Sequence, residues 1–127
     1  MAILVKRIYE PAAAQDGFRI LVDRLWPRGI SKERAQLGLW MRDIAPSNEL
    51  RKWFGHEASK WPEFQERYRA ELATRSDLLD SLLGLEQEHQ VITLLFGARD
   101  QEHNEAMVLL DVLNSRRRRR LFSTSSS

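Results

Sequence analysis

Two turns with many charged residues each follow a short apolar segment of this chain. Their chemically useful side chains are Asp23, Arg24, Arg28, Arg99, Asp100, His103 and Asn104. An arginine guanidinium binds a carboxylate or phosphate through two parallel hydrogen bonds. Histidine and carboxylate groups can transfer protons near neutral pH. These residue types predict recognition of an anionic molecule, and they leave open whether the protein also converts that molecule.

Within this hypothesis the side chains take three kinds of role. The cations that hold the anion are Arg24, Arg28 and Arg99. The candidate catalytic residues, which would move a proton, are His103, Asp100 and Asp23. The remaining residue, Asn104, would orient a carbonyl or phosphoryl oxygen of the ligand.

Structural roles stay open for the same residues. Asp100 is of a type that often forms the N-terminal cap of a helix. His103, in the first turn of that helix, could be a partly buried side chain with a single hydrogen bond. Asp23 and Arg24 could form an ion pair between neighbouring elements. The charged motif is therefore either a ligand site or an internal network, and we carry both interpretations forward.

Three aromatic side chains lie close to the charged residues, namely Trp26, Trp53 and His56. An indole ring can form the wall of a pocket or stack on a base. A histidine just beyond a helix end is also favoured by the helix dipole alone. We add these three residues to the candidate ligand-binding set.

Several classes of chemistry are excluded or find no support. The chain has no cysteine, which excludes disulfides, thiolate catalysis and cysteine metal ligands. The acidic residues and histidines show no compact metal-ligand spacing, so no metal site is predicted. The sequence has no glycine-rich phosphate-binding loop of the Walker or dinucleotide-binding type. The cofactor, if the protein uses one, is therefore unknown.

The charged turns can meet only if the segments before them lie side by side. Apolar residues at 3–9, 18–25 and 91–96 predict three strands. The third is continuously apolar, as expected of a parallel strand covered on both faces. If the second and third strands are parallel neighbours, both turns lie at the carboxyl edge of the sheet, where open α/β folds bind ligands. The short link between the first two strands allows either a hairpin or an irregular parallel connection.

The other periodic segments predict helices. One is expected from Ser31 to about Ile44, and a shorter one from Ser47 to the stop at Gly55. Further helices are expected to begin near residues 59, 76 and 100. The predicted fold is α/β, with a small, mainly parallel sheet of three to four strands flanked by helices. A helical insert is expected between strands two and three.

Length and charge indicate one folded domain at residues 1–114, followed by a tail. The five arginines at 116–120 exceed the net charge of +2, so the rest of the chain is net acidic. Residues 115–127 are expected to be disordered, and contact with nucleic acid is expected only through this tail. No segment is apolar enough to span a membrane, and no secretion signal is recognised, so a cytoplasmic location is expected.

The charged turns also carry a family resemblance. The resemblance rests on Val-Asp-Arg-Leu-Trp-Pro-Arg-Gly at 22–29, Ser-Lys at 31–32 and Ala-Pro-Ser at 45–47. Through these strings the chain resembles the YeaO-like family, bacterial proteins built from a domain of unknown function. The strings at 50–56 and 93–104 extend the resemblance, which covers about residues 3–113. It implies an α/β domain. More distant relatives carry Cys-His-Arg near the place of residues 102–104. Because this chain has Glu102 in place of that cysteine, the resemblance does not imply thiol chemistry here. It does imply that His103 corresponds to the histidine of those relatives.

Three functions remain in competition. The leading hypothesis is an uncharacterised protein with an arginine-rich polar pocket at the carboxyl edge of the sheet, which binds an anionic or nucleotide-like small molecule. The second is a nucleic-acid-associated protein that uses the basic tail. The third is a structural or interaction domain whose charged motif is an internal ion-pair network. The sequence sets neither the substrate nor the oligomeric state.

Overall fold

The computed structural model describes the backbone of residues 1–125 and the side chains of residues 1–120. Parallel strands form a sheet in the order β1-β4-β2-β3, with the bounds β1 (Ala2–Arg7), β2 (Phe18–Leu21), β3 (Leu39–Trp40) and β4 (Val91–Phe96). The α-helices are α1 (Lys32–Ala35), α2 (Asn48–Phe54), α3 (Trp61–Ala73), α4 (Ser76–His89) and α5 (Glu105–Ser125). The predicted α/β class and small parallel sheet are confirmed.

Strand β4 lies in the middle of the sheet and is covered on both faces. Its side chains alternate in direction, as they must in an extended strand. Ile92, Leu94 and Phe96 enter the main core, whereas Leu95 enters a smaller cluster on the opposite face. Strand β4 pairs in parallel with β1 on one side and with β2 on the other, so the condition under which both charged turns share the carboxyl edge is met.

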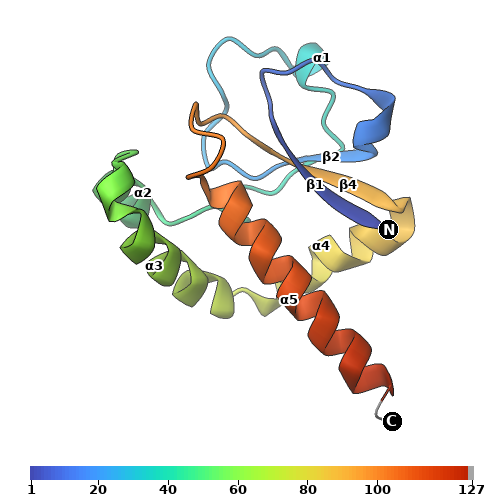
Figure 1. Ribbon diagram of the computed structural model, residues 1–127. Coiled ribbons are helices and arrows are strands. Elements are labelled where there is room, and N and C mark those ends of the chain that lie inside the picture. The colour runs from blue at the N-terminus through green and yellow to red at the C-terminus, as the bar shows by residue number, and fades with distance from the viewer. Residues whose placement is uncertain (126–127) are drawn as a thin grey trace.

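Helices cover one face of the sheet, and loops with α1 cover the other. Helices α4 and α5 pack against β4, while α3 packs against α2, α4 and α5 (Figure 1). The three helices α2, α3 and α4 follow one another between β3 and β4. Within the described residues, no helix combines the length and the apolar character needed to cross a membrane.

The link between β1 and β2 is an irregular parallel connection and not a hairpin, because the two strands lie on opposite sides of β4. A 3-10 turn, Ala14–Asp16, precedes Gly17, whose φ is 62°. The Asp16 carboxylate accepts hydrogen bonds from Lys6 at 3.0 Å and from Arg19 at 2.5 Å. This ion-paired turn lets a short segment begin a second strand parallel to the first.

The prediction of a helix over residues 31–44 was wrong beyond the first helical turn. Ser31 caps α1 as expected, since its hydroxyl accepts the Arg34 N–H at 3.0 Å. The helix ends at Gln36, whose φ is 46°. The next residues form β3 and extend the sheet beside β2. Of the apolar residues at helical spacing, Trp40 lies in β3 and Ile44 lies in the 3-10 turn Arg42–Ile44 that follows, an arrangement that local periodicity does not reveal.

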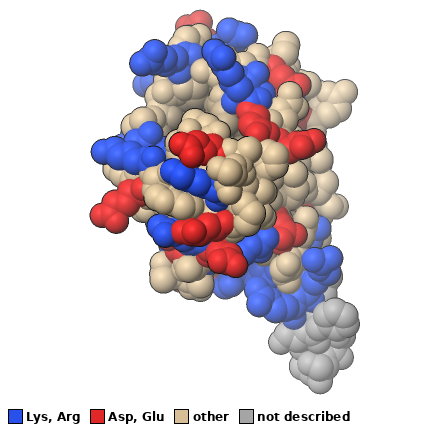
Figure 2. All heavy atoms as spheres, turned by 60° about the vertical axis from the view of Figure 1, so that its left-hand side comes forward, with Lys and Arg blue, Asp and Glu red and all other residues tan. Residues whose placement is uncertain are grey.

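Helix α5 continues through the arginine run at 116–120. Arg116 pairs with Asp80 at 2.9 Å, and Arg117 pairs with Glu86, so both arginines contact α4. Figure 2 shows Lys and Arg side chains gathered where the described chain meets the grey atoms. Of the segment that the sequence assigns to a tail, residues 126 and 127 lie outside the described residues.

Candidate functional site

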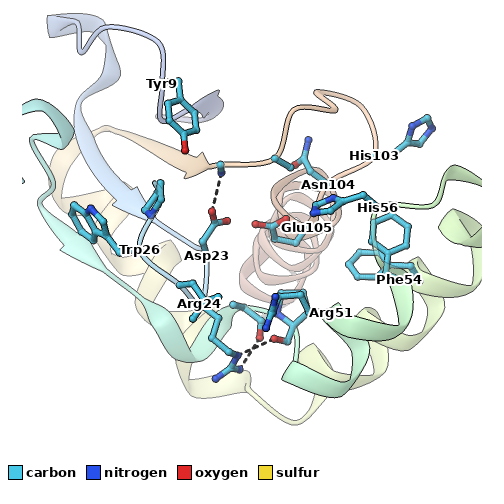
Figure 3. A pocket seen from close by; sticks show the side chains of 17 residues that line it. Tyr9, Asp23, Arg24, Trp26, Arg51, Phe54, His56, His103, Asn104 and Glu105 are labelled. Atoms are coloured by element: carbon cyan, nitrogen blue, oxygen red, sulfur yellow. Dashed lines mark hydrogen bonds between the residues drawn. The ribbon is translucent and has the colours of Figure 1, made fainter. Parts of the chain in front are cut away.

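The carboxyl ends of β2 and β4 open together into one cavity. Their register pairs Leu21 with Leu95, which brings Asp23 beside Gly97. The Asp23 carboxylate accepts a hydrogen bond from the Gly97 N–H at 2.8 Å. A cavity of about 260 Å³ lies here, with walls from the turn after β2, from α2 and α3, and from the segment that joins β4 to α5 (Figure 3).

The cavity gathers six of the candidate residues from three distant parts of the chain. They are Asp23, Arg24, Trp26, His56, His103 and Asn104. The other four lie outside its walls, namely Arg28, Arg99, Asp100 and Trp53. The carboxyl edge of the sheet therefore does bring most of the charged motif together, but its arginines are divided between the cavity and the surface.

The residues outside the cavity have surroundings of their own. Arg28 is exposed, and its carbonyl accepts the Tyr9 hydroxyl at 2.9 Å. Arg99 is exposed in the turn after β4. Trp53 lies under the guanidinium of Arg67, 4.4 Å from the ring centre. These three side chains do not face a ligand in the cavity.

Asp100 lies outside the cavity walls but contacts His103, which lines them. Its carboxylate accepts the N–H groups of His103 and Glu102, each at 2.9 Å, and contacts His103 Nδ1 at 2.9 Å. These hydrogen bonds, the His103 N–H first, lower the pKa of Asp100 to about 2. With Nδ1 directed to Asp100, Nε2 is the ring nitrogen left for other partners. The ring lies at the outer rim, edge-on to Trp61 (Figure 3).

Two of the lining residues use their polar groups on the backbone. Asn104 is buried and caps α5, since its Oδ1 accepts the Met107 N–H at 3.1 Å. Arg24 donates from Nε to the Pro46 carbonyl at 3.1 Å and from Nη2 to the Ala45 carbonyl at 3.4 Å. The bonds of Arg24 join the turn after β2 to the segment before α2, and the bond of Asn104 caps the first turn of α5.

The cavity walls also include residues that the sequence did not single out as site residues, among them Tyr9, Arg51, Phe54, Phe64 and Glu105. Arg51 and Phe54 belong to the string at 50–56 that carried the family resemblance, so a signal for them was present. Glu105 directly follows the motif at 99–104 but has the ordinary look of an acid in the first turn of a helix. Only the packing of α5 against the sheet edge gives it a special position.

Glu105 and Asp23 form a pair of carboxyl groups that face each other in the cavity (Figure 3). Glu105 is half-buried and lines the cavity at the start of α5. Burial raises the pKa of Glu105 well above its ordinary value, and the negative charge of Asp23 and a hydrogen bond between the two side chains raise it further. Two hydrogen-bonded carboxyl groups favour sharing one proton over being ionised together.

The raised pKa gives a direct stability prediction. Stabilisation by protonated Glu105 is complete below the pKa of the unfolded chain and is lost as the pH rises through the folded value. We expect Glu105→Gln, which cannot ionise, to melt above the natural protein by a margin that grows from pH 5 to pH 9. Thermal melting monitored by circular dichroism measures this margin. Glu102→Gln, at an exposed site, is the control and should show no such trend.

Comparisons with known proteins agree with one another. A family model described as "Inactive DUF488-N3 subclade" matches residues 2–127. The chain is 46% identical over 115 residues to the uncharacterized protein YeaO of Escherichia coli (strain K12), covering 91% of this chain and 99% of that protein. It is 40% identical over 116 residues to the uncharacterized protein Rv3073c of Mycobacterium tuberculosis (strain ATCC 25618 / H37Rv), covering 90% and 95% of the two chains. No solved structure matches significantly.

Proposed function

Because this chain belongs to the YeaO-like family of uncharacterised proteins, within the inactive DUF488-N3 subclade, we propose that it binds a small anionic or nucleotide-like molecule in the cavity at the sheet edge. One observation carries the proposal. A single cavity collects polar side chains from the turn after β2, from α2 and from the start of α5 between apolar walls. Convergent polar groups in an otherwise apolar hollow are typical of ligand sites.

The volume of the cavity limits the ligand. At about 260 Å³ it lies just below the range of about 300–1,000 Å³ that is usual for ligand pockets. A phosphorylated sugar or a mononucleotide that leaves part of itself in solvent suits this space better than a dinucleotide. The word "inactive" in the family description supports binding over turnover as the proposed activity.

The cations of the cavity support an anionic ligand. Arg51, His56 and His103 line its outer part. Arg51 is exposed and makes one long hydrogen bond, of 3.5 Å, to the Asn48 side chain of its own helix. An arginine in this setting can turn both of its terminal nitrogens toward a phosphate or carboxylate. Asp23 and Glu105 lie deeper in the cavity, so the anionic group is expected at the rim and not beside them.

The internal-network alternative receives less support. Within residues 1–120, no ion pair joins Asp23, Arg24, Arg28 or Arg99, and the one ion pair of the motif links Asp100 to His103. The nucleic-acid alternative is supported by exposed Arg118 and Arg119 at the end of α5. The charges on the visible face of the body are mixed in sign, which does not favour a broad phosphate-binding surface (Figure 2).

The experiment that tests the proposal is titration calorimetry with adenosine 5′-monophosphate. Arg51→Ala is expected to weaken binding by about 10- to 100-fold, because a hydrogen bond to a charged group contributes ~1.5–3 kcal/mol. Lys52→Ala is the matched control, since it removes an exposed cation one residue away that does not line the cavity. Equal affinities of the two variants would refute the assignment of the anion to Arg51. Absence of binding by the natural protein would refute the proposed function.

A further inference from the structure

Asp23 and Glu105 are held in place by separate parts of the fold. The Gly97 N–H fixes the Asp23 carboxylate at 2.8 Å. A Cβ built at residue 97 would lie 3.0 Å from Asp23 Oδ2, so glycine suits this close approach. Glu105 is the first residue of α5, directly after the Asn104 cap. The two carboxyl groups therefore meet because β2, β4 and α5 end at the same edge, and neither can easily swing away.

The hydrogen bond between the two carboxyl groups favours one shared proton, which gives the pair a mixed hydrogen-bonding character. The start of a helix favours a negative charge, but burial and the charge of Asp23 outweigh this effect and raise the pKa of Glu105. A carboxyl pair that shares one proton offers an O–H donor together with acceptor oxygens. Tyr68 from α3 interacts electrostatically with both carboxyl groups. The other polar side chains that line the cavity are Tyr9, Arg24, Arg51, His56, His103 and Asn104. Of these, Tyr9, Arg24 and Asn104 use their polar groups on the backbone.

Tyr68 does not compete for the proton of the pair. Its hydroxyl donates to the Ile44 carbonyl at 2.6 Å, and burial raises its pKa well above the ordinary value. It therefore stays neutral under the conditions in which the carboxyl pair titrates. The two histidines line the rim where the anion is expected, so their effect on binding should be similar for every anion.

The pair discriminates between the chemical groups that could lie against it. A second anion would be repelled by Asp23, so a bare phosphate gains nothing there. A hydroxyl group can accept the Glu105 proton in a hydrogen bond and donate its own hydrogen to Asp23. The apolar side chains of Trp26 and Phe54 add a wall against which a sugar ring can pack.

Resting on the proposed function, we infer that the Asp23–Glu105 pair recognises a hydroxyl group of the ligand. The ligand is therefore a phosphorylated sugar or polyol, with its hydroxyl groups toward the pair and its anionic group toward Arg51. On this basis the cavity selects a phosphorylated pentose over a bare phosphate, and Glu105 determines that preference.

The test uses ribose 5-phosphate and inorganic phosphate as probes in titration calorimetry at pH 6, 7.5 and 9. The ratio of the two affinities is the readout, because both probes share the phosphate and the same rim. In the natural protein ribose 5-phosphate should bind about tenfold more tightly than inorganic phosphate, which is the gain in affinity expected from one to two extra hydrogen bonds. The ratio should fall toward one as the pH rises and Glu105 ionises.

Two variants separate recognition from folding. Glu105→Gln keeps a donor and an acceptor but cannot ionise, so it should keep the preference for the sugar phosphate at all three pH values. Glu105→Ala should abolish the preference while still binding phosphate, and Glu102→Gln should behave like the natural protein. Melting curves confirm that each variant is folded before the titrations.

The outcomes distinguish this inference from the proposed function. Equal, measurable affinities for both probes in the natural protein overturn the hydroxyl assignment and leave anion binding in place. A preference that survives in Glu105→Ala also overturns it. If neither probe binds at millimolar concentration, the inference falls, and the adenosine monophosphate titration decides whether the proposed function falls with it.

Discussion

Replacing Arg117 with alanine is expected to destabilise the protein by about 2–4 kcal/mol. Arg117 pairs with Glu86, whose side chain is only 2% exposed, and also donates to Asn114 at 3.1 Å. Removing one partner of a buried ion pair costs about 3–5 kcal/mol, because the other charge stays buried without compensation. Since the Arg117 side chain is 33% exposed, solvent screens part of the interaction and the expected loss is somewhat smaller. Urea unfolding measures the change.

Two further variants make this result specific. Arg119→Ala removes an exposed arginine of the same run and should change the stability by no more than about 0.5 kcal/mol. Adding Glu86→Gln to Arg117→Ala should recover part of the loss, because the buried charge is then gone. Similar losses for Arg117→Ala and Arg119→Ala would contradict the assignment of Arg117 to the folded domain. This distinction also bears on truncations, because removing residues 116–127 would disturb the fold together with the exposed arginines.

Replacing Gly17 with alanine is expected to destabilise the protein by about 2–5 kcal/mol. Its φ of 62° and ψ of −134° lie in a region that is nearly closed to residues with a Cβ, at a cost of ~1–3 kcal/mol. A Cβ at this position would lie 2.3 Å from the Val91 carbonyl oxygen and 2.8 Å from the Val91 Cβ. Relieving such an overlap typically costs a further ~1–3 kcal/mol. Urea unfolding gives the free energy.

The matched control for this prediction is Gly84→Ala in the middle of α4. A Cβ there would meet nothing within 4 Å, and helical backbone suits alanine better than glycine. We therefore expect this variant to be more stable than the natural protein by about 0.5–1 kcal/mol. A loss of stability at both glycines would show that close packing at Gly17 is not the reason for its effect.

Local patterns in the sequence predicted much of the scaffold of the site. The apolar run of β4 predicted a strand buried on both faces, and the charged turns after β2 and β4 predicted their shared edge. Ser47 and Gly55 predicted the two ends of α2, where the Ser47 hydroxyl accepts the Leu50 N–H at 3.1 Å and Gly55 has a φ of 51°. These features depend on residues close together in the chain, so short-range chemistry is enough to reveal them.

The contents of the cavity depended more on tertiary contacts. Arg24 and Asn104 were expected to bind a ligand, but their polar groups hold the backbone of the turn before α2 and of the first turn of α5. Arg99 was one of the arginines expected to hold the anion, yet it is exposed outside the cavity, and Arg51 lies on the wall instead. A turn sequence shows which residue types are available but not the direction of each side chain.

The sequence by itself determined the α/β class, the three strand segments and the charged turns that follow the second and third of them, because periodicity, capping and turn residues act locally. The parallel pairing of those two strands, which places both turns at one edge, came from the tertiary structure. Only the tertiary structure decided that residues 39–40 join the sheet, that Arg117 completes a buried pair with Glu86, and that Glu105 meets Asp23. Each of these depends on partners 19 to 82 residues apart, brought together by packing of whole elements. A carboxyl group acquires an unusual proton affinity from such neighbours and not from the residues beside it in the chain.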